Sequence, residues 1–214
     1  AGALPSRHQI EHQPHPRRRI GRRQCTRLAQ VFTIGSEDEV EAVEILGRQL
    51  PAAQVADVYS RWNEGELRSF LVEITADILR FPDPEDPSRL LVDAILDRAG
   101  QKGTGKWTVL AAVEHGVPVP TIAAAVDARN LSAARDLRVR AEAALRPVRA
   151  PLAGVSVDDL RDALYAAKIC SYTQGFALLA LASEQRGYGT DLGEVARIWT
   201  AGCIIRAVFL DRIR

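Results

Sequence analysis

The feature that most constrains the fold is a long helical segment from about Val157 to Gln185. Ser156 and Asp159 are spaced as a capping box that begins a helix, and Gly187 and Gly189 provide its end. The second half of the segment is apolar nearly all round, so it has to be buried on several sides. We therefore expect a helical domain packed around this segment. We also expect further cover from a missing remainder of the protein or from a partner chain.

Helical patterns also dominate the rest of the sequence. Apolar residues recur at helical spacing from Leu67 to Ile78, and Asn63 and Glu66 resemble a capping pair at the start of that helix. Prolines at 82, 84 and 87 end it in a loop. We find no alternating strand pattern and no internal repeat, so the sequence predicts an all-α, multi-helix domain. The other expected helices cover residues 37–47, 52–62, 105–115, 121–129, 132–145 and 195–212.

The first residues differ in composition from the rest of the chain. Residues 1–27 hold seven arginines and one glutamate, which gives this segment +6 and leaves −5 on the remainder of a chain of net charge +1. Such a segment has little apolar surface to bury, so we expect a basic arm over residues 1–35, disordered at its start, and a helical domain over residues 36–214. A basic arm can bind nucleic acid, but no aromatic residue lies between these arginines. We expect a solvated tail and no nucleic-acid partner.

Cysteine content and hydropathy bear on the cellular compartment. The longest strongly apolar run, residues 175–182, is too short to cross a bilayer, and residues 1–27 lack the apolar core of a signal peptide. Cys25, Cys170 and Cys203 are odd in number and have no metal-ligand spacing. Cys170 and Cys203 sit in apolar helical contexts, so we expect both to be buried thiols. These features indicate a cytoplasmic protein with no membrane partner and no metal.

The richest chemistry lies in a glycine-rich loop over residues 99–108. Two of the three lysines of the chain, Lys102 and Lys106, fall in this loop beside two threonines, three glycines and one tryptophan. Glycine lets a backbone approach a ligand closely, and a helix-compatible apolar run follows from Val109. A cationic loop that feeds a helix N-terminus is suited to anions. The alternative is a solvated glycine loop in which the lysines occur by chance. The residue pattern alone supports the anion site and the solvated loop about equally.

The same loop partly fits a nucleotide-binding pattern. Gly100 to Lys106 matches the first seven positions of the Walker A motif, but the next position requires serine or threonine and is Trp107. No clear apolar strand precedes the loop, because Leu90 to Leu96 is short and flanked by acidic residues. We therefore reject an ATPase.

Eight stretches of the sequence carry a family resemblance: residues 62–67, 73–79, 100–107, 116–120, 128–132, 163–169, 171–176 and 197–206. In the same order, they resemble decarboxylating 6-phosphogluconate dehydrogenase. The resemblance runs from about Pro51 to Arg214, roughly three quarters of the chain. Chance similarity does not explain several long motifs in the expected order.

The resemblance implies a fold and a reaction. The family oxidises 6-phosphogluconate with NADP and releases carbon dioxide, which gives ribulose 5-phosphate. Its members combine an N-terminal Rossmann domain, a large all-helical domain and a C-terminal tail that reaches into the partner subunit. By this resemblance the chain carries part of the helical domain, with 6-phosphogluconate as its ligand and either a homodimer or an intact subunit as its partner.

The resemblance also assigns a phosphate-binding set. In the family, residues at the places of Lys102, Thr104 and Arg129 bind the substrate phosphate, and two cations with one hydroxyl donor suit a dianion. The alternatives are that Thr104 is an N-cap and that Arg129 binds C-terminal carbonyls of its own helix. His115 is expected to cap a helix end. Five further residues match family positions and are expected to pack or form hydrogen bonds: Lys106, Trp107, Lys168, Tyr172 and Gln174.

Other family features are missing from this sequence. The family's catalytic element, Lys-x-x-His-Asn-Gly-x-Glu-Tyr, should fall around residues 22–34, where neither its lysine, its His-Asn pair nor its glutamate occurs. The glycine-rich dinucleotide loop and the C-terminal tail are absent too. We therefore assign no catalytic, NADP-binding or metal-binding residue and expect a fragment that is inactive alone. The alternative is a non-catalytic helical interaction or dimerisation module.

Overall fold

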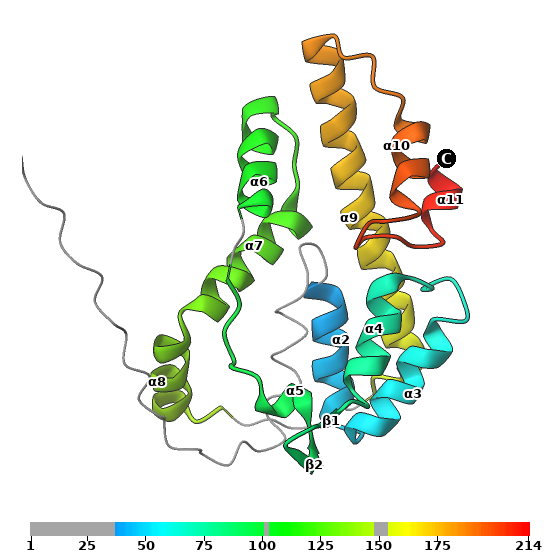
Figure 1. The fold of residues 1–214 in the computed structure, drawn as a ribbon. Coiled ribbons are helices and arrows are strands. Elements are labelled where there is room, and N and C mark those ends of the chain that lie inside the picture. The colour runs from blue at the N-terminus through cyan, green and yellow to red at the C-terminus, as the bar shows by residue number, and fades with distance from the viewer. Residues whose placement is uncertain (1–36, 101–102, 148–153) are drawn as a thin grey trace, which may run out of the picture.

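The computed structural model describes residues 37–100, 103–147 and 154–214. In those ranges it contains ten helices and one two-stranded sheet, which confirms the predicted helical class (Figure 1). The expected basic arm, Cys25 and Lys102 lie outside the described residues. The elements are α2 Glu37–Gly47, α3 Ala52–Trp62, α4 Phe70–Ile78, β1 Pro82–Asp83, β2 Asp86–Leu90, α5 Leu91–Ala94, α6 Thr104–His115, α7 Pro120–Ala133, α8 Arg135–Leu145, α9 Val157–Arg186, α10 Leu192–Trp199 and α11 Leu210–Ile213.

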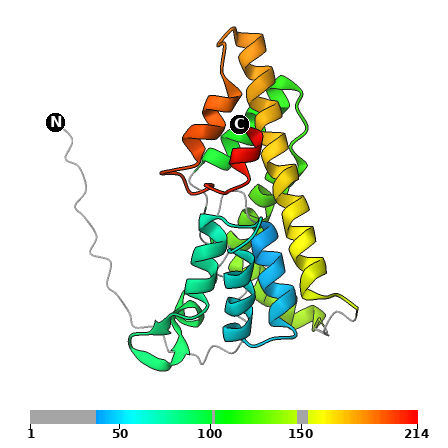
Figure 2. The ribbon, with the colours of Figure 1, turned by 90° about the vertical axis from the view of Figure 1, so that its right-hand side faces the viewer.

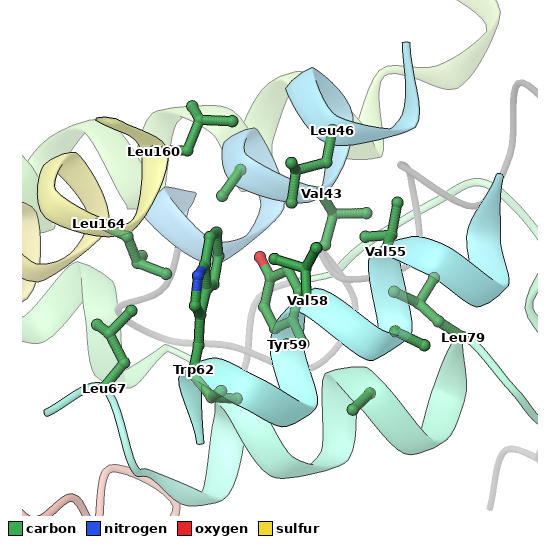
Figure 3. Close-up of a cluster of buried hydrophobic side chains, with 14 residues drawn as sticks. Val43, Leu46, Val55, Val58, Tyr59, Trp62, Leu67, Leu79, Leu160 and Leu164 are labelled. Atoms are coloured by element: carbon green, nitrogen blue, oxygen red, sulfur yellow. The ribbon is translucent and has the colours of Figure 1, made fainter. Parts of the chain in front are cut away.

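The largest hydrophobic core lies where α2, α3 and α4 meet the beginning of α9 (Figure 3). Helix α3 is strongly amphipathic because Val55, Val58, Tyr59 and Trp62 recur at helical spacing and are all buried. The rings of Tyr59 and Trp62 have their centroids 5.0 Å apart, and Leu164 of α9 belongs to the same cluster. This core fixes the N-terminal half of the long helix.

Helix α9 joins the two ends of the molecule (Figures 1 and 2). Its capping box is confirmed: the Ser156 hydroxyl accepts from the Asp159 amide at 3.0 Å, and the Asp159 carboxylate accepts from the Ser156 amide at 2.9 Å. The helix ends at Gly187 with a φ of 66°, a left-handed conformation that favours glycine. After leaving the core, α9 contacts α6, α7 and α10, so the second half does have neighbours on several sides.

Helices α6, α7 and α8 follow one another down the left of the view in Figure 1, and α6 and α7 contact α9. Gly116, with a φ of 70°, ends α6, and Pro120 occupies the first turn of α7. A small cluster of Ala112, Val119 and Leu178 packs this pair of helices against α9. The expected break at residues 130–131 is wrong, because α7 continues to Ala133 before α8 begins.

Two other helix boundaries differ from expectation. The helix predicted from Leu67 begins at Phe70, because Ser69 is the N-cap and its hydroxyl accepts from the Val72 amide at 3.3 Å. Asn63 instead ends α3, and its side chain accepts from the Ser69 amide at 3.0 Å. The continuous helix expected over 195–212 is wrong, since Gly202 takes a left-handed φ of 67° between α10 and α11.

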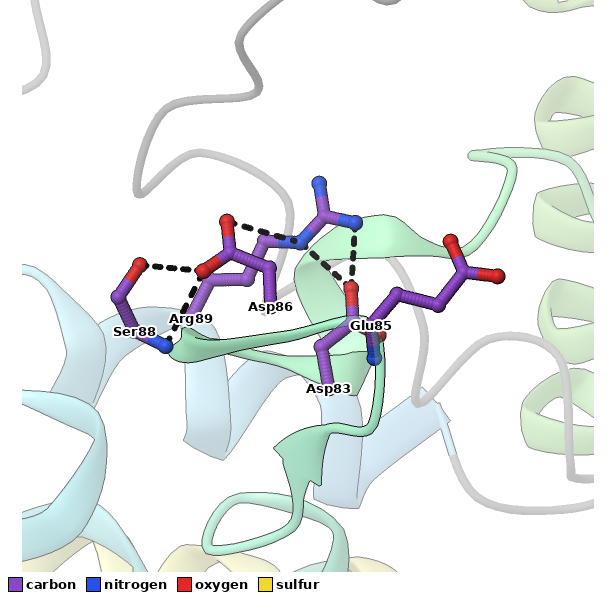
Figure 4. Close-up of polar contacts among 5 residues, drawn as sticks. All are labelled: Asp83, Glu85, Asp86, Ser88 and Arg89. Atoms are coloured by element: carbon purple, nitrogen blue, oxygen red, sulfur yellow. Dashed lines mark hydrogen bonds and ion pairs between the residues drawn. The ribbon is translucent and has the colours of Figure 1, made fainter.

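The proline-rich loop contains the sheet that no alternating pattern had predicted. Strands β1 and β2 are antiparallel, and side chains stabilise their turn (Figure 4). Asp83 is only 3% exposed; it accepts from the Glu85 amide at 2.9 Å and from Arg89 Nε at 2.5 Å. The Glu85 amide and the Arg89 guanidinium hold the pKa of Asp83 below its usual value.

The expectation that Cys170 and Cys203 are buried thiols is wrong. Cys170 is exposed and Cys203 is partly exposed, so neither is a buried thiol. The sequence context of Cys170 is apolar and helical, but no described element covers its side of α9 at that position.

Candidate functional site

The glycine-rich loop ends where α6 begins. Gly103 is the N-cap of α6, and its φ of 98° is a conformation that other residues rarely adopt. A Cβ atom on Gly103 would lie 3.7 Å from the indole ring of Trp107, so the tryptophan packs directly on the turn. Thr104 is therefore the first helical residue, which corrects the alternative that it caps the helix. Its side chain is exposed at the positive end of the helix dipole.

Arg129 holds the start of the same loop. The half-buried guanidinium donates to the carbonyl oxygen of Gly100 from Nε at 3.1 Å and from Nη2 at 2.6 Å. These bonds reach the loop and not the end of α7, which lies one turn further on at Ala133. Burial lowers the pKa of Arg129 below its ordinary value, but arginine stays protonated in proteins.

Of the three predicted phosphate ligands, the structure describes Thr104 and Arg129 and not Lys102. Thr104 lies where the loop ends, and Arg129 contacts the beginning of the loop at Gly100. Helices α6 and α7 meet closely here, because a Cβ atom on Gly105 would lie 2.9 Å from Cγ2 of Val126. The close approach at Gly105 fixes the helix that begins with Thr104 against the helix that carries Arg129.

A partly buried ion pair behind the loop was missed by the sequence analysis. Asp97 is 1% exposed, and its Oδ2 accepts from Nη1 of Arg138 at 3.0 Å. The amide of Ala99 donates to the hydroxyl of Ser132 at 3.0 Å. Asp97 lies in an irregular segment, and Arg138 stands 41 residues later, so no local pattern links them.

The other residues matched by resemblance mostly make structural contacts. Lys168 Nζ lies 3.5 Å from the Ser69 hydroxyl, and the Tyr172 hydroxyl donates to the carbonyl of Ile205. Gln174 Oε1 accepts from both the amide and the hydroxyl of Thr121, at 3.0 and 2.8 Å. Trp107 packs on the loop as described above. Lys106 is exposed.

His115 does not cap the end of α6, which is closed by the backbone of Gly116. The imidazole Nδ1 lies 2.5 Å from Oε1 of Gln185 on α9. Beside it, Glu114 forms an ion pair with Arg186 at 2.8 Å. Together these contacts tie the end of α6 to the end of α9.

An apolar cleft of about 630 Å³ opens between α6, α9 and the segment after α10. Polar groups are few, and Thr104, Lys168 and Arg206 are among them. The Arg206 guanidinium lies 3.7 Å from the centroid of the Phe70 ring, as in a cation–π contact. The apolar lining includes Leu71, Trp107, Ile122, Leu178, Leu179 and Trp199.

Two kinds of feature are absent from the described residues. No group of three or more histidine, cysteine, aspartate and glutamate residues there could hold a metal ion. Within the same ranges, no helix has the length and apolarity that crossing a bilayer requires.

These features define a class of protein: a helical domain with a cationic, glycine-rich loop at a helix N-terminus, where an anionic group can be held. Comparison with known families identifies the family to which this domain belongs. The family model for the C-terminal domain of 6-phosphogluconate dehydrogenase matches residues 39–214. The chain therefore belongs to this family of oxidoreductases, which confirms the resemblance seen in the sequence.

Individual relatives agree. The chain is 51% identical over 187 residues to the chloroplastic decarboxylating 6-phosphogluconate dehydrogenase 2 of Oryza sativa, covering 81% of this chain and 37% of that protein. It is 53% identical over 170 residues to the decarboxylating enzyme of Synechococcus elongatus, covering 77% and 36%. The chain thus spans a little over a third of the length of these relatives.

A solved structure supports the same assignment. It is that of Plasmodium falciparum 6-phosphogluconate dehydrogenase, described in its apo form, with its cofactor NADP+ and with its substrate 6-phosphogluconate. The match has a TM-score of 0.78 and 42% sequence identity, and it covers 90% of this chain and 42% of that one. The fold of the helical domain is therefore shared with an enzyme of this family.

Proposed function

We propose that this chain supplies the substrate-phosphate subsite in the oxidative decarboxylation of 6-phosphogluconate to ribulose 5-phosphate with NADP. The observation that carries the proposal is the pair of hydrogen bonds from Arg129 to the Gly100 carbonyl. These bonds keep the half-buried Arg129 guanidinium at the loop that ends where Thr104 begins α6. The names of the relatives support the reaction, and the geometry of the loop supports the phosphate as the group that is bound.

Each proposed ligand has a distinct role toward the phosphate. Lys102 and Arg129 supply positive charge, and the exposed Thr104 hydroxyl donates a hydrogen bond. Amides of the first turn of α6 add the partial positive charge of a helix N-terminus. Charge-assisted hydrogen bonds of this kind contribute about 1.5–3 kcal/mol each, so two or three of them support measurable binding of a phosphate dianion.

Turnover needs groups that this sequence does not contain. The residues present do not fit NADP, because no glycine-rich dinucleotide turn follows a strand in the sequence. A base lysine for the substrate hydroxyl and an acid for the intermediate are missing at residues 22–34 as well. We therefore place hydride transfer outside this chain. Its partner in our proposal is a second copy or an intact subunit of the family, in the cytoplasm.

A second candidate function is a non-catalytic interaction module. It is favoured by the cleft of about 630 Å³, which exposes apolar side chains of α6 and α9 next to one another. Co-purification of the chain with a full-length relative, without measurable binding of 6-phosphogluconate, would favour this second function over the first.

Calorimetric titration with two matched ligands tests the phosphate subsite. We expect the 214-residue chain to bind 6-phosphogluconate at low salt and to bind gluconate, which lacks the phosphate, at least tenfold more weakly. Inorganic phosphate should compete with 6-phosphogluconate. Equal affinity for the two sugar acids would contradict the proposal, because the phosphate would then contribute nothing.

A further inference from the structure

One arginine of α8 binds the chain immediately before the glycine-rich loop. Arg138 donates from Nη1 to the carboxylate of Asp97 at 3.0 Å and from Nη2 to the backbone carbonyl of the same residue at 2.9 Å. The planar guanidinium therefore binds both the side chain and the main chain of Asp97. A lysine ammonium does not reproduce this fork geometry.

The same guanidinium also binds the end of α7. Nη2 donates to the carbonyl of Ser132 at 2.9 Å, and Nε donates to the carbonyl of Leu131 at 3.0 Å. Carbonyl groups in the last turn of a helix lack the usual partner four residues later, so they are open to side-chain donors. The Leu131 carbonyl also accepts from the amide of Ala134 at 3.1 Å, and Arg138 provides it with a second donor. One side chain thus joins the loop, the end of α7 and the beginning of α8.

A second contact runs beside the ion pair. The Ser132 hydroxyl accepts from the amide of Ala99, and both residues are at most 2% exposed. The next residue, Gly100, is the one whose carbonyl Arg129 binds. Three of the four residues from Asp97 to Gly100 are therefore fixed to the α7–α8 region immediately before the proposed phosphate subsite.

We propose that Asp97 and Arg138 are positioning residues of the phosphate subsite. They do not touch the ligand; they hold the chain at Ala99 and Gly100, so that Arg129 and the loop meet the phosphate in one geometry. This inference rests on the proposed function. Asp97 is buried and the side chain of Arg138 is 25% exposed, so neutralising Asp97 leaves a partly buried arginine without its charge partner and loosens the loop.

The test uses the isosteric variant Asp97→Asn and the matched control Asp83→Asn. Asp83 is also an almost fully buried aspartate, 3% exposed and paired with an arginine, but it lies in the β1–β2 hairpin. Two quantities are measured on the full chain: the hydrogen-exchange rate of the Ala99 amide by NMR, and the affinity for 6-phosphogluconate by calorimetry. Ser132→Ala, which removes only the acceptor of the Ala99 amide, provides a milder variant that keeps the ion pair.

We expect Asp97→Asn to accelerate exchange at Ala99 at least tenfold and to weaken binding roughly tenfold. Ser132→Ala should also accelerate exchange at Ala99, because it removes the acceptor of that amide, but it should weaken binding less, because it keeps the ion pair. Asp83→Asn should change neither quantity beyond its effect on global stability. Equal exchange at Ala99 in the two aspartate variants would overturn the inference. So would faster exchange with unchanged affinity. A wild-type chain that does not bind 6-phosphogluconate would instead reject the proposed function, while accelerated exchange would still support the anchoring of Ala99 by Asp97.

Discussion

Arg129 and Gly100 are joined by two hydrogen bonds across 29 residues of sequence, from Nε at 3.1 Å and from Nη2 at 2.6 Å to a single carbonyl oxygen. This contact makes the position of the guanidinium depend on the backbone of the loop. In the proposed phosphate subsite, the contact with Gly100 orders the Arg129 side chain, so binding of the phosphate should cost little side-chain entropy.

The two lysines of the loop should differ in their effect on binding. Lys102→Ala should weaken the affinity for 6-phosphogluconate roughly tenfold or more, because it removes one charge-assisted contact to the phosphate. Lys106→Ala should have a smaller effect, since Lys106 is exposed on α6 and is expected to be structural. Calorimetric titration of both variants at low salt measures the difference. A larger loss with Lys106→Ala would show that the wrong lysine has been assigned.

The purified chain should not form NADPH from 6-phosphogluconate and NADP. Hydride transfer requires a bound nicotinamide and a positioned base, and this sequence has neither the dinucleotide loop nor the family's base lysine. The measurement is absorbance at the NADPH band, with a full-length family member as positive control. Turnover that persists after rigorous removal of host enzyme would refute the expectation.

Gly105 should not tolerate a side chain. Gly105→Ala places a methyl group 2.9 Å from Cγ2 of Val126, and this overpacking should cost about 1–3 kcal/mol of unfolding free energy, offset by up to about 1 kcal/mol from the better helix propensity of alanine. Chemical denaturation measures the loss. Combining Gly105→Ala with Val126→Ala should recover part of it.

The control for this substitution is Gly175→Ala in α9. A Cβ atom there would meet nothing within 4 Å, so alanine should be neutral or stabilising by roughly 0.5–1 kcal/mol. If both variants lost the same stability, the contact between Gly105 and Val126 would not be the cause.

The capping box of α9 should give the chain a pH-dependent contribution to stability. Hydrogen bonds from the hydroxyl and amide of Ser156 lower the pKa of Asp159. A carboxyl whose pKa is lower in the folded state stabilises it fully above the ordinary aspartate pKa of about 4, and the contribution disappears as the pH falls through the lowered value. Ser156→Ala should cost about 1 kcal/mol at pH 7.

As the pH falls from about 5 to about 2, Ser156→Ala should lose less stability than the wild type. Without the Ser156 hydroxyl, the pKa of Asp159 would be closer to its ordinary value. Denaturation curves at several pH values test this. Parallel curves for the two proteins would contradict a coupling between Ser156 and Asp159.

The helices that were predicted most accurately carry their own signals. Helix α3 agrees with the expected residues 52–62, and α9 has both a capping box and a terminal glycine in the sequence. The expected C-terminal helix failed because tertiary contacts decide that region. Ala207 pairs with Ser69 in an isolated antiparallel bridge, and no local pattern around residue 207 indicates a partner so far away in the chain.

The candidate site was predictable in part. Resemblance to a family pointed to Thr104 and Arg129, whereas the role of Arg129 toward Gly100 required the packing of α7 beside the loop. Asp97 and Arg138 could not be found from the sequence. Their pairing depends on the α7–α8 break at Ala134, which was expected several residues earlier.

Helix α9 links the three hydrophobic clusters of the described residues. Leu160 and Leu164 belong to the core with α2 and α3, Leu178 belongs to the cluster with α6 and α7, and Phe176 belongs to the cluster with α10 and α11. One continuous hydrogen-bonded backbone thus participates in all three clusters. Fraying of any of them removes support from the others, so the described part of the chain is expected to unfold as a single cooperative unit and to show similar amide protection along most of α9.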